Sequence, residues 1–290
     1  MFYNERGYGD FPYTDLACER RRVSTDIKGV DYKREATLIG AWERIKISSE
    51  DGARSIGRPI GIYDTLEVER MDLLDLEAID DAADEIAREL CYMCDMSDTT
   101  PDRVLVVGLG NPELTPDAIG PEAARCVKAT MHIRDFDTEF FHGLECSEIA
   151  VISPGVSASS GMDASVTVRG VCELIKPTVI FAIDALASRS AERLGRTVQI
   201  SNTGIFPGSG IGNGRTAISK DTVGVPVIAI GVPTIIDSRM FCYDAWGDDP
   251  YARCGARESM FVAPKEINEI VKASAKIIGG GINQAFGLFY

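Results

Sequence analysis

The sequence has no long apolar segment and very few histidines. No stretch of the 290-residue chain approaches the roughly 18 to 20 uncharged apolar residues that cross a bilayer. The first residues also lack the cationic and apolar regions of a signal peptide. We therefore expect a soluble, cytoplasmic protein with no membrane partner. Only His132 and His142 are available for a metal site or for Ser-His or Cys-His catalysis, so we expect neither metal nor cofactor.

Basic residues are in the minority. The chain has 30 Lys and Arg against 44 Asp and Glu, which gives a net charge of -14 and a pI near 4.7. A phosphate backbone is bound by clustered Lys and Arg, so this balance argues against direct binding to nucleic acid. An acidic surface is compatible with basic or neutral partners.

The cysteines do not form a recognisable framework. Eight are scattered through a chain too large to depend on disulfides, and we interpret them as reduced thiols. Cys91 and Cys94 form a C-x-x-C at the end of a helical pattern, without a second pair at zinc-ribbon spacing. We interpret this pair as core packing.

The length suits one substantial core. Residues 35–290 are expected to form a single α/β domain, with residues 35–70 as a small N-terminal lobe. Residues 1–34 show no hydrophobic periodicity and are predicted to be an extended or mobile leader.

Apolar strands alternate with helices along the chain. Residues 103–110 and 178–183 are continuous apolar runs, as expected of buried parallel strands, and residues 73–90 have the spacing of an amphipathic helix. The pattern predicts a mainly parallel sheet with helices on both faces. The other predicted strands and helices are strands at 37–47, 148–152 and 225–232, and helices at 121–132, 164–175 and 265–278.

Two aspartates are placed for catalysis. Asp184 follows the strand at 178–183, and Asp117 lies in the loop that connects the strand at 103–110 to its helix. Reactive groups collect at the carboxyl ends of strands in such sheets. Two neighbouring carboxyls cannot both ionise easily, so one can act as a base and the other as an acid in hydrolysis. The structural alternative is that each carboxylate caps a helix or ties down a loop.

Two glycine-rich loops offer backbone amides. Gly108, Gly110 and Asn111 form one, and Gly208, Ser209 and Gly210 form the other. Neither matches a nucleotide-binding fingerprint, and Ser209 lacks the surroundings of a nucleophile elbow. Either loop could form an oxyanion or substrate pocket.

Several motifs in fixed order resemble one known family. They are V-G-L-G-N at 107–111, T-P-D-A-I-G-P at 115–121, A-I-D-A-L-A-S-R-S at 182–190, and the segments 203–213 and 226–234. Together they resemble the germination protease of endospore-forming bacteria (peptidase family A25) along nearly the whole chain.

The resemblance implies an activity and a setting. It implies an endopeptidase whose essential aspartates are Asp117 and Asp184, with the fold of the hydrogenase-maturation peptidases. It implies small acid-soluble spore proteins as substrates, a homotetramer, and a location in the forespore and spore core. The short segment after the glycines at 279–281 lacks the longer tail of some relatives, which leaves tail-dependent assembly contacts in doubt.

The resemblance also implies a zymogen. Family members remove a short N-terminal peptide at a Thr or Ser, acidic, hydrophobic, Ala sequence, which Thr14-Asp15-Leu16-Ala17 fits. We therefore expect residues 1–15 to be a propeptide and self-cleavage to fall between Asp15 and Leu16. Two alternatives stay open: a nickel-sensing hydrogenase-maturation peptidase, and a non-catalytic ligand-binding module built on the glycine loops.

Overall fold

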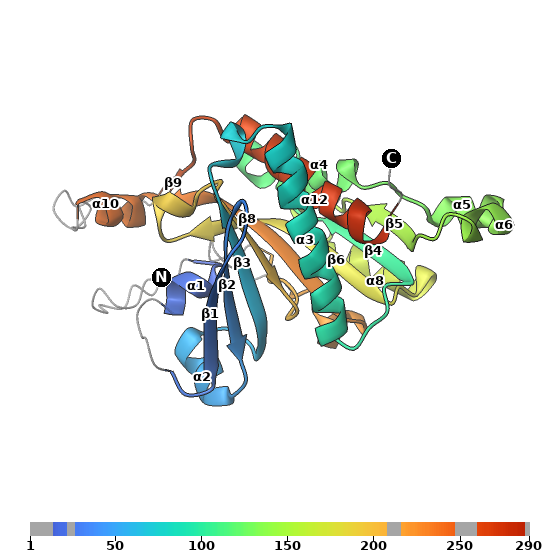
Figure 1. Ribbon diagram of the computed structural model, residues 1–290, viewed down its shortest axis with the longest axis horizontal. Coiled ribbons are helices and arrows are strands. Elements are labelled where there is room, and N and C mark those ends of the chain that lie inside the picture. The colour runs from blue at the N-terminus through green and yellow to red at the C-terminus, as the bar shows by residue number, and fades with distance from the viewer. Residues whose placement is uncertain (1–13, 22–26, 208–215, 247–259, 288–290) are drawn as a thin grey trace.

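A nine-stranded mixed sheet forms the centre of the computed structural model, which describes residues 14–21, 27–207, 216–246 and 260–287 (Figure 1). Its strand order is β1-β2-β3-β7-β8-β6-β4-β5, and β9 pairs with β8. The strands are β1 (Val30–Ala36), β2 (Gly40–Ile47), β3 (Gly61–Val68), β4 (Arg103–Gly108), β5 (Glu148–Ile152), β6 (Val179–Ser188), β7 (Thr197–Ser201), β8 (Val227–Asp237) and β9 (Phe261–Val262).

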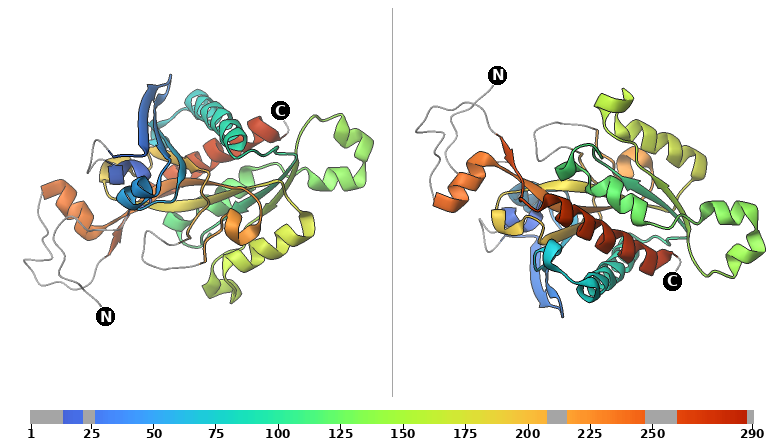
Figure 2. Two further views of the ribbon diagram at one scale, coloured as in Figure 1. Left: turned by 90° about the horizontal axis from the view of Figure 1, so that it is seen from below. Right: turned by 90° about the horizontal axis from the view of Figure 1, so that it is seen from above.

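Helices cover both faces of this sheet, as the sequence predicts (Figure 2). Val104 and Val106 of β4 pack in the core with α3 (Leu76–Met96), α4 (Ile119–Cys126) and α12 (Ile267–Phe286). Leu105 and Val107 pack on the opposite face against α8 (Ala164–Ile175). The alternation follows from the two-residue period of a strand. The remaining helices are α1 (Ala17–Arg21), α2 (Glu50–Ile56), α5 (Met131–Phe136), α6 (Thr138–His142), α7 (Ser157–Ser160), α9 (Lys220–Val223) and α10 (Ser238–Trp246).

The α/β class is confirmed, and the parallel arrangement holds for the central strands. The neighbours in the order β5-β4-β6-β8 are parallel. The neighbours in the order β1-β2-β3-β7 are antiparallel, and β7 is also antiparallel to β8. The sheet as a whole is therefore mixed. The short turn between β1 and β2 permits only an antiparallel pair, whereas the parallel neighbours are joined by longer crossovers.

The N-terminal lobe consists of β1, β2, β3 and α2, and it corrects two predictions. Residues 37–39, predicted as strand, form the hairpin turn between β1 and β2, where the Thr37 N–H donates to Gly40 O at 2.9 Å. Residues 30–34, assigned to an extended or mobile leader, belong to strand β1, which continues to Ala36. Its side chains are mostly exposed, which explains why no hydrophobic pattern marked it.

Two predicted helices end at other residues. The helix predicted at 121–132 stops at Cys126, whose carbonyl accepts a hydrogen bond from Asn283 Nδ2 of α12 at 2.9 Å. The helix predicted at 265–278 continues through three glycines to Phe286, because the glycines let α12 pack closely on α3 and α4. Among the helices described, none combines the length and apolar character that crossing a bilayer requires.

Candidate active site

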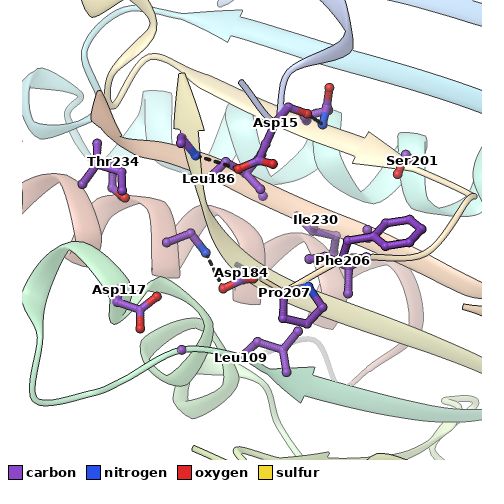
Figure 3. A pocket seen from close by; sticks show the side chains of 18 of the residues that line it. Asp15, Leu109, Asp117, Asp184, Leu186, Ser201, Phe206, Pro207, Ile230 and Thr234 are labelled. Atoms are coloured by element: carbon purple, nitrogen blue, oxygen red, sulfur yellow. Dashed lines mark hydrogen bonds between the residues drawn. The ribbon is translucent and has the colours of Figure 1, made fainter. Parts of the chain in front are cut away.

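A cavity of about 360 Å³ lies at the carboxyl ends of β4 and β6, and both predicted aspartates line it. In Figure 3 the carboxylates of Asp117 and Asp184 point toward one another from different elements. This is the crevice in which open α/β sheets place their ligands. The structure therefore brings the two candidate residues together in one place.

Asp184 lies inside a strand rather than after it. The strand predicted to end at residue 183 continues to Ser188, but its pairing with β4 stops at Gly108 and Ile183. From Asp184 onward, β6 pairs with β8 alone, so this strand extends past the end of β4. Asp184 is 7% exposed, and its Oδ1 accepts a hydrogen bond from the Ala185 N–H at 2.9 Å.

Asp117 ends a single 3-10 turn in the loop after β4. The turn spans Thr115–Asp117, and the Asp117 N–H donates to Leu114 O at 2.7 Å. The Asn111 N–H donates to Asp117 Oδ2 at 2.8 Å, so the loop holds its own carboxylate in place. Gly110 has a φ of 114°, and a Cβ there would lie 2.0 Å from Asp117 O. Only glycine permits this close return of the loop.

The first glycine loop contributes to the cavity through one residue of the predicted set. Gly110 lines the cavity, whereas Gly108 packs against Gly120 of α4, where a Cβ would lie 2.3 Å from Gly120 O. The Asn111 amide is occupied by Asp117. Gly208, Ser209 and Gly210 of the second loop lie outside the described residues.

The N-terminal segment lies in the same cavity. The Asp15 N–H donates to Ala187 O, and the Ala187 N–H donates to Asp15 Oδ2, both at 2.9 Å. Gln199 Nε2 donates to Asp15 O at 3.1 Å, and its Oε1 accepts from the Ala17 N–H at 2.8 Å. Asp15 thus binds to β6 and β7 in the cavity that Asp117 and Asp184 line.

Arginines surround the segment just before Asp15. Arg58 Nη2 donates to Thr14 O at 2.9 Å and lies 3.5 Å from Asp15 Oδ1. Arg20 also donates to Thr14 O. Burial, followed by the nearby Arg58, lowers the pKa of Arg20, whereas Asp15 raises it. The cavity therefore places positive charge beside an acidic residue of a bound peptide segment.

Glu19 anchors the residues that follow. The residue is 4% exposed, and its carboxylate accepts hydrogen bonds from the Arg189 N–H at 2.7 Å and the Ser190 N–H at 2.9 Å. The Thr14 hydroxyl donates to the same carboxylate. Arg193 Nε lies 4.0 Å away. A buried carboxylate with several donors of this kind is a strong attachment point.

Residues 14–21 are therefore not the extended or mobile leader that the sequence predicts. Leu16 and Ala17 are 0% exposed and pack in one cluster with Ile45, Ile47 and Leu186. The prediction missed this because the apolar run is short and its partners lie far along the chain. Burial of a leucine side chain contributes roughly 1.5 to 3 kcal/mol, so the cluster stabilises the docked segment.

Of the other candidate residues, some line the cavity and some lie away from it. Arg58 and Gln199 line the cavity, although no local sequence motif indicated a role for them. His132 and His142 lie on α5 and α6, and neither lines this cavity (Figure 1). Among the residues that the structure describes, no cluster of three or more His, Cys, Asp and Glu side chains is arranged to hold a metal.

The C-x-x-C pair is divided between core and surface. Cys94 is 2% exposed and packs in the main core, as predicted, whereas Cys91 is exposed. Burial, followed by Cys91, raises the pKa of Cys94 to about 12. The seven described cysteines are free thiols.

The fold and the cavity define a class of protein. A peptide segment lies in the crevice of an α/β sheet beside two facing carboxylates, so the cavity is a site that holds a peptide. Residues 13–247 match the family described as germination protease.

The chain belongs to the germination protease family, whose members are peptidases with protein substrates. It is 35% identical to the germination protease of Caldanaerobacter subterraneus subsp. tengcongensis, over 94% of this chain and 93% of the relative. It is 33% identical to that of Clostridium perfringens, over 94% of each chain.

A similarity to a solved structure is weaker. The [NiFe] hydrogenase maturation protease HycI from Thermococcus kodakarensis KOD1 matches with a TM-score of 0.35 and 16% identity, over 65% of this chain and 96% of the other. A match at this level does not extend to function.

Proposed function

We propose that this chain is an endopeptidase that begins the degradation of small acid-soluble spore proteins during germination, with Asp117 and Asp184 as its catalytic pair. One observation carries the proposal: the acidic residue of a peptide segment is bound in the cavity that both aspartates line. The family match supports spore germination as the setting. The proposed location is the cytoplasm of the forespore and the spore core.

The chemistry needs one carboxylate as a base and the other as an acid. The ionised carboxylate takes a proton from water, and the water oxygen attacks the carbonyl carbon of the peptide bond. The protonated carboxyl then donates to the leaving nitrogen as the C–N bond breaks. Each proton transfer contributes roughly 10² to 10⁴-fold. The facing arrangement of Asp117 and Asp184 suits this division.

The same reaction is proposed to release the propeptide. Residues 1–15 leave when the bond between Asp15 and Leu16 is cut. The proposal is supported by the hydrogen bonds that hold Asp15 on both sides, through Ala187 and Gln199. After the cut, Glu19 keeps the N-terminal segment attached through the Arg189 and Ser190 N–H groups, while Leu16 and Ala17 move out of the positions beside Gln199 and leave them free for a substrate.

The test uses a small acid-soluble spore protein as substrate and follows its products by mass spectrometry. Wild type and all variants are produced as fusions whose removal leaves Leu16 as the first residue, so that no variant has to cut its own propeptide. We expect the wild type and the control Asp84→Asn, an exposed position on α3, to cut after the acidic residue, and both site variants to be inert. Normal cleavage by a folded site variant would show that the catalytic assignment is wrong.

Assembly is a separate part of the proposal. By its family, the chain is proposed to form a homotetramer. Sedimentation equilibrium on the full chain measures this directly: a mass of about four times 31.4 kDa is expected, and a monomeric mass would contradict it.

A further inference from the structure

Gln199 brackets the peptide bond that is proposed to be cut. The residue lies in β7 and is 9% exposed. Its Nε2 donates to Asp15 O at 3.1 Å, on the carbonyl side of the bond, and its Oε1 accepts from the Ala17 N–H at 2.8 Å, one residue beyond it. Both ends of the side-chain amide are therefore fixed by the bound main chain, and Nε2 has to face the carbonyl oxygen.

The sheet places Gln199 in the same row as Asp184. Gln199 pairs with Gly231 of β8, and Gly231 pairs with Asp184 of β6. Residues paired across strands direct their side chains to the same face, and two strand spacings separate the outer pair by about 10 Å. The residue between them has no side chain, and a Cβ at Gly231 would lie 2.5 Å from the Leu186 side chain. Gln199 and Asp184 thus face one cavity from two sides.

We propose that the side-chain amide of Gln199 is a catalytic group that stabilises the oxyanion formed on the carbonyl of the bond being cut. The inference rests on the proposed function and on its cut between Asp15 and Leu16. Attack by the water oxygen moves the carbonyl π electrons onto oxygen, and the Gln199 N–H donates to that negative charge. When the carbonyl re-forms, the C–N bond breaks and the Leu16 nitrogen takes a proton from the protonated aspartate.

The contacts of Gln199 go to main-chain atoms, which every peptide substrate has. In the described part of the segment, residues 14–21, Gln199 bonds to the main-chain atoms of Asp15 and Ala17. A spore protein bound in the same way after the propeptide has left presents the same two groups. A buried donor aimed at a developing oxyanion is worth roughly 10²- to 10³-fold in turnover. The glycine loop supplies less, because the Asn111 amide is already engaged by Asp117.

The test is the turnover of Gln199→Glu, which has nearly the same shape but no N–H donor at neutral pH. The enzyme is prepared with the Leu16 terminus as above, and kcat and KM are measured on a peptide with the Thr-Asp-Leu-Ala sequence. We expect kcat to fall by about 10²-fold or more, with KM changed less than about threefold. Asn268→Asp, an exposed amide-to-acid change on α12, should match the wild type.

The pH dependence of kcat is a second measurement, and it distinguishes a catalytic role of Gln199 from a role in binding alone. A protonated Glu regains an O–H donor, so kcat of Gln199→Glu relative to wild type should rise as the pH is lowered toward about 4. A rise in KM with unchanged kcat would overturn the inference, and the proposed function would still stand. If Gln199→Glu does not melt cooperatively, Gln199→Met gives the same comparison of kcat with KM. Failure of the wild type to cut the peptide would instead count against the proposed function.

Discussion

At the scale of single residues, Gly110 decides where a carboxylate lies. Its φ of 114° and its contact with Asp117 leave no space for a Cβ. The loop can therefore turn back after β4 and deliver Asp117 to the cavity. Gly161 has a similar left-handed φ of 73°, but nothing lies within 4 Å of its missing Cβ. A comparison of the two positions therefore distinguishes the effect of a left-handed backbone from the effect of a steric clash.

Gly110→Ala should abolish most of the peptidase activity, and Gly161→Ala should leave it unchanged. Both changes carry a strain of roughly 1 to 3 kcal/mol from the left-handed backbone, measurable by urea unfolding. Only the first also displaces Asp117, and a shift of about 1 Å at a catalytic group can cost 10²-fold in rate. Equal activity of the two variants would contradict the proposed position of Asp117.

A second group of residues concerns stability rather than the cavity. The carboxyls of Asp64 in β3 and Glu89 in α3 are both buried and share Arg44, whose Nη1 lies 2.5 Å from one and 2.6 Å from the other. Glu35 also pairs with Arg44, and Tyr92 packs against it. Burial, followed by the neighbouring Asp64, raises the pKa of Glu89 to about 8. Burial also raises the pKa of Asp64.

The raised pKa of Glu89 predicts how the free energy of unfolding changes with pH. The folded protein holds a proton on Glu89 that the unfolded chain, with an ordinary value near 4.5, releases. The free energy of unfolding should therefore fall as the pH rises from about 4.5 to about 8. Glu89→Gln, an uncharged match for the protonated acid, should flatten this fall in thermal melts. Exposed Glu173→Gln serves as control, and an unchanged pH profile for Glu89→Gln would contradict the shift.

At the scale of elements, α12 shows how packing overrides helix propensity. Three consecutive glycines end the periodic pattern in the sequence, yet the helix continues to Phe286. A Cβ at Gly279 would lie 2.4 Å from Cys126 Cβ of α4, and one at Gly281 would lie 2.7 Å from Ile86 Cγ2 of α3. The missing side chains let three helices approach closely and cover one face of the sheet.

Gly281→Ala should therefore destabilise the protein despite the better helix propensity of alanine. Overpacking costs roughly 1 to 3 kcal/mol, which exceeds the gain of about 1 kcal/mol from propensity. Gly170→Ala on α8 has nothing within 4 Å and should be stabilising by about that gain. Urea denaturation of both variants measures the difference, and a stabilised Gly281→Ala would show that α12 does not need its close approach.

The sequence predicts elements well where one physical signal dominates. The apolar runs of β4, β6 and β8 and the amphipathic spacing of α3 are such cases, because burial alone explains them. Boundaries were less predictable: β6 continues beyond its apolar run through Asp184, since β8 pairs with it as far as Ser188. Short β7 was missed, because its five residues include polar Thr197, Gln199 and Ser201.

At the scale of the whole molecule, the site joins segments that the sequence separates widely. Motifs identified Asp117 and Asp184, and the structure places both on one cavity. Asp15 was identified as a cleavage position, but its contacts with Ala187 and Gln199 span more than 170 residues. No local pattern encodes such contacts, so Gln199 and Arg58 became visible only in the folded protein.

The central claim is that the bound N-terminal segment is cut by the two aspartates beside it. The most direct test incubates the full chain and follows its intact mass with time, for wild type, Asp184→Asn and the control Asp84→Asn. We predict that wild type and control lose residues 1–15 and begin at Leu16, at a rate independent of protein concentration, while Asp184→Asn stays intact. A chain starting at Leu16 that appears at the wild-type rate in Asp184→Asn would contradict the account.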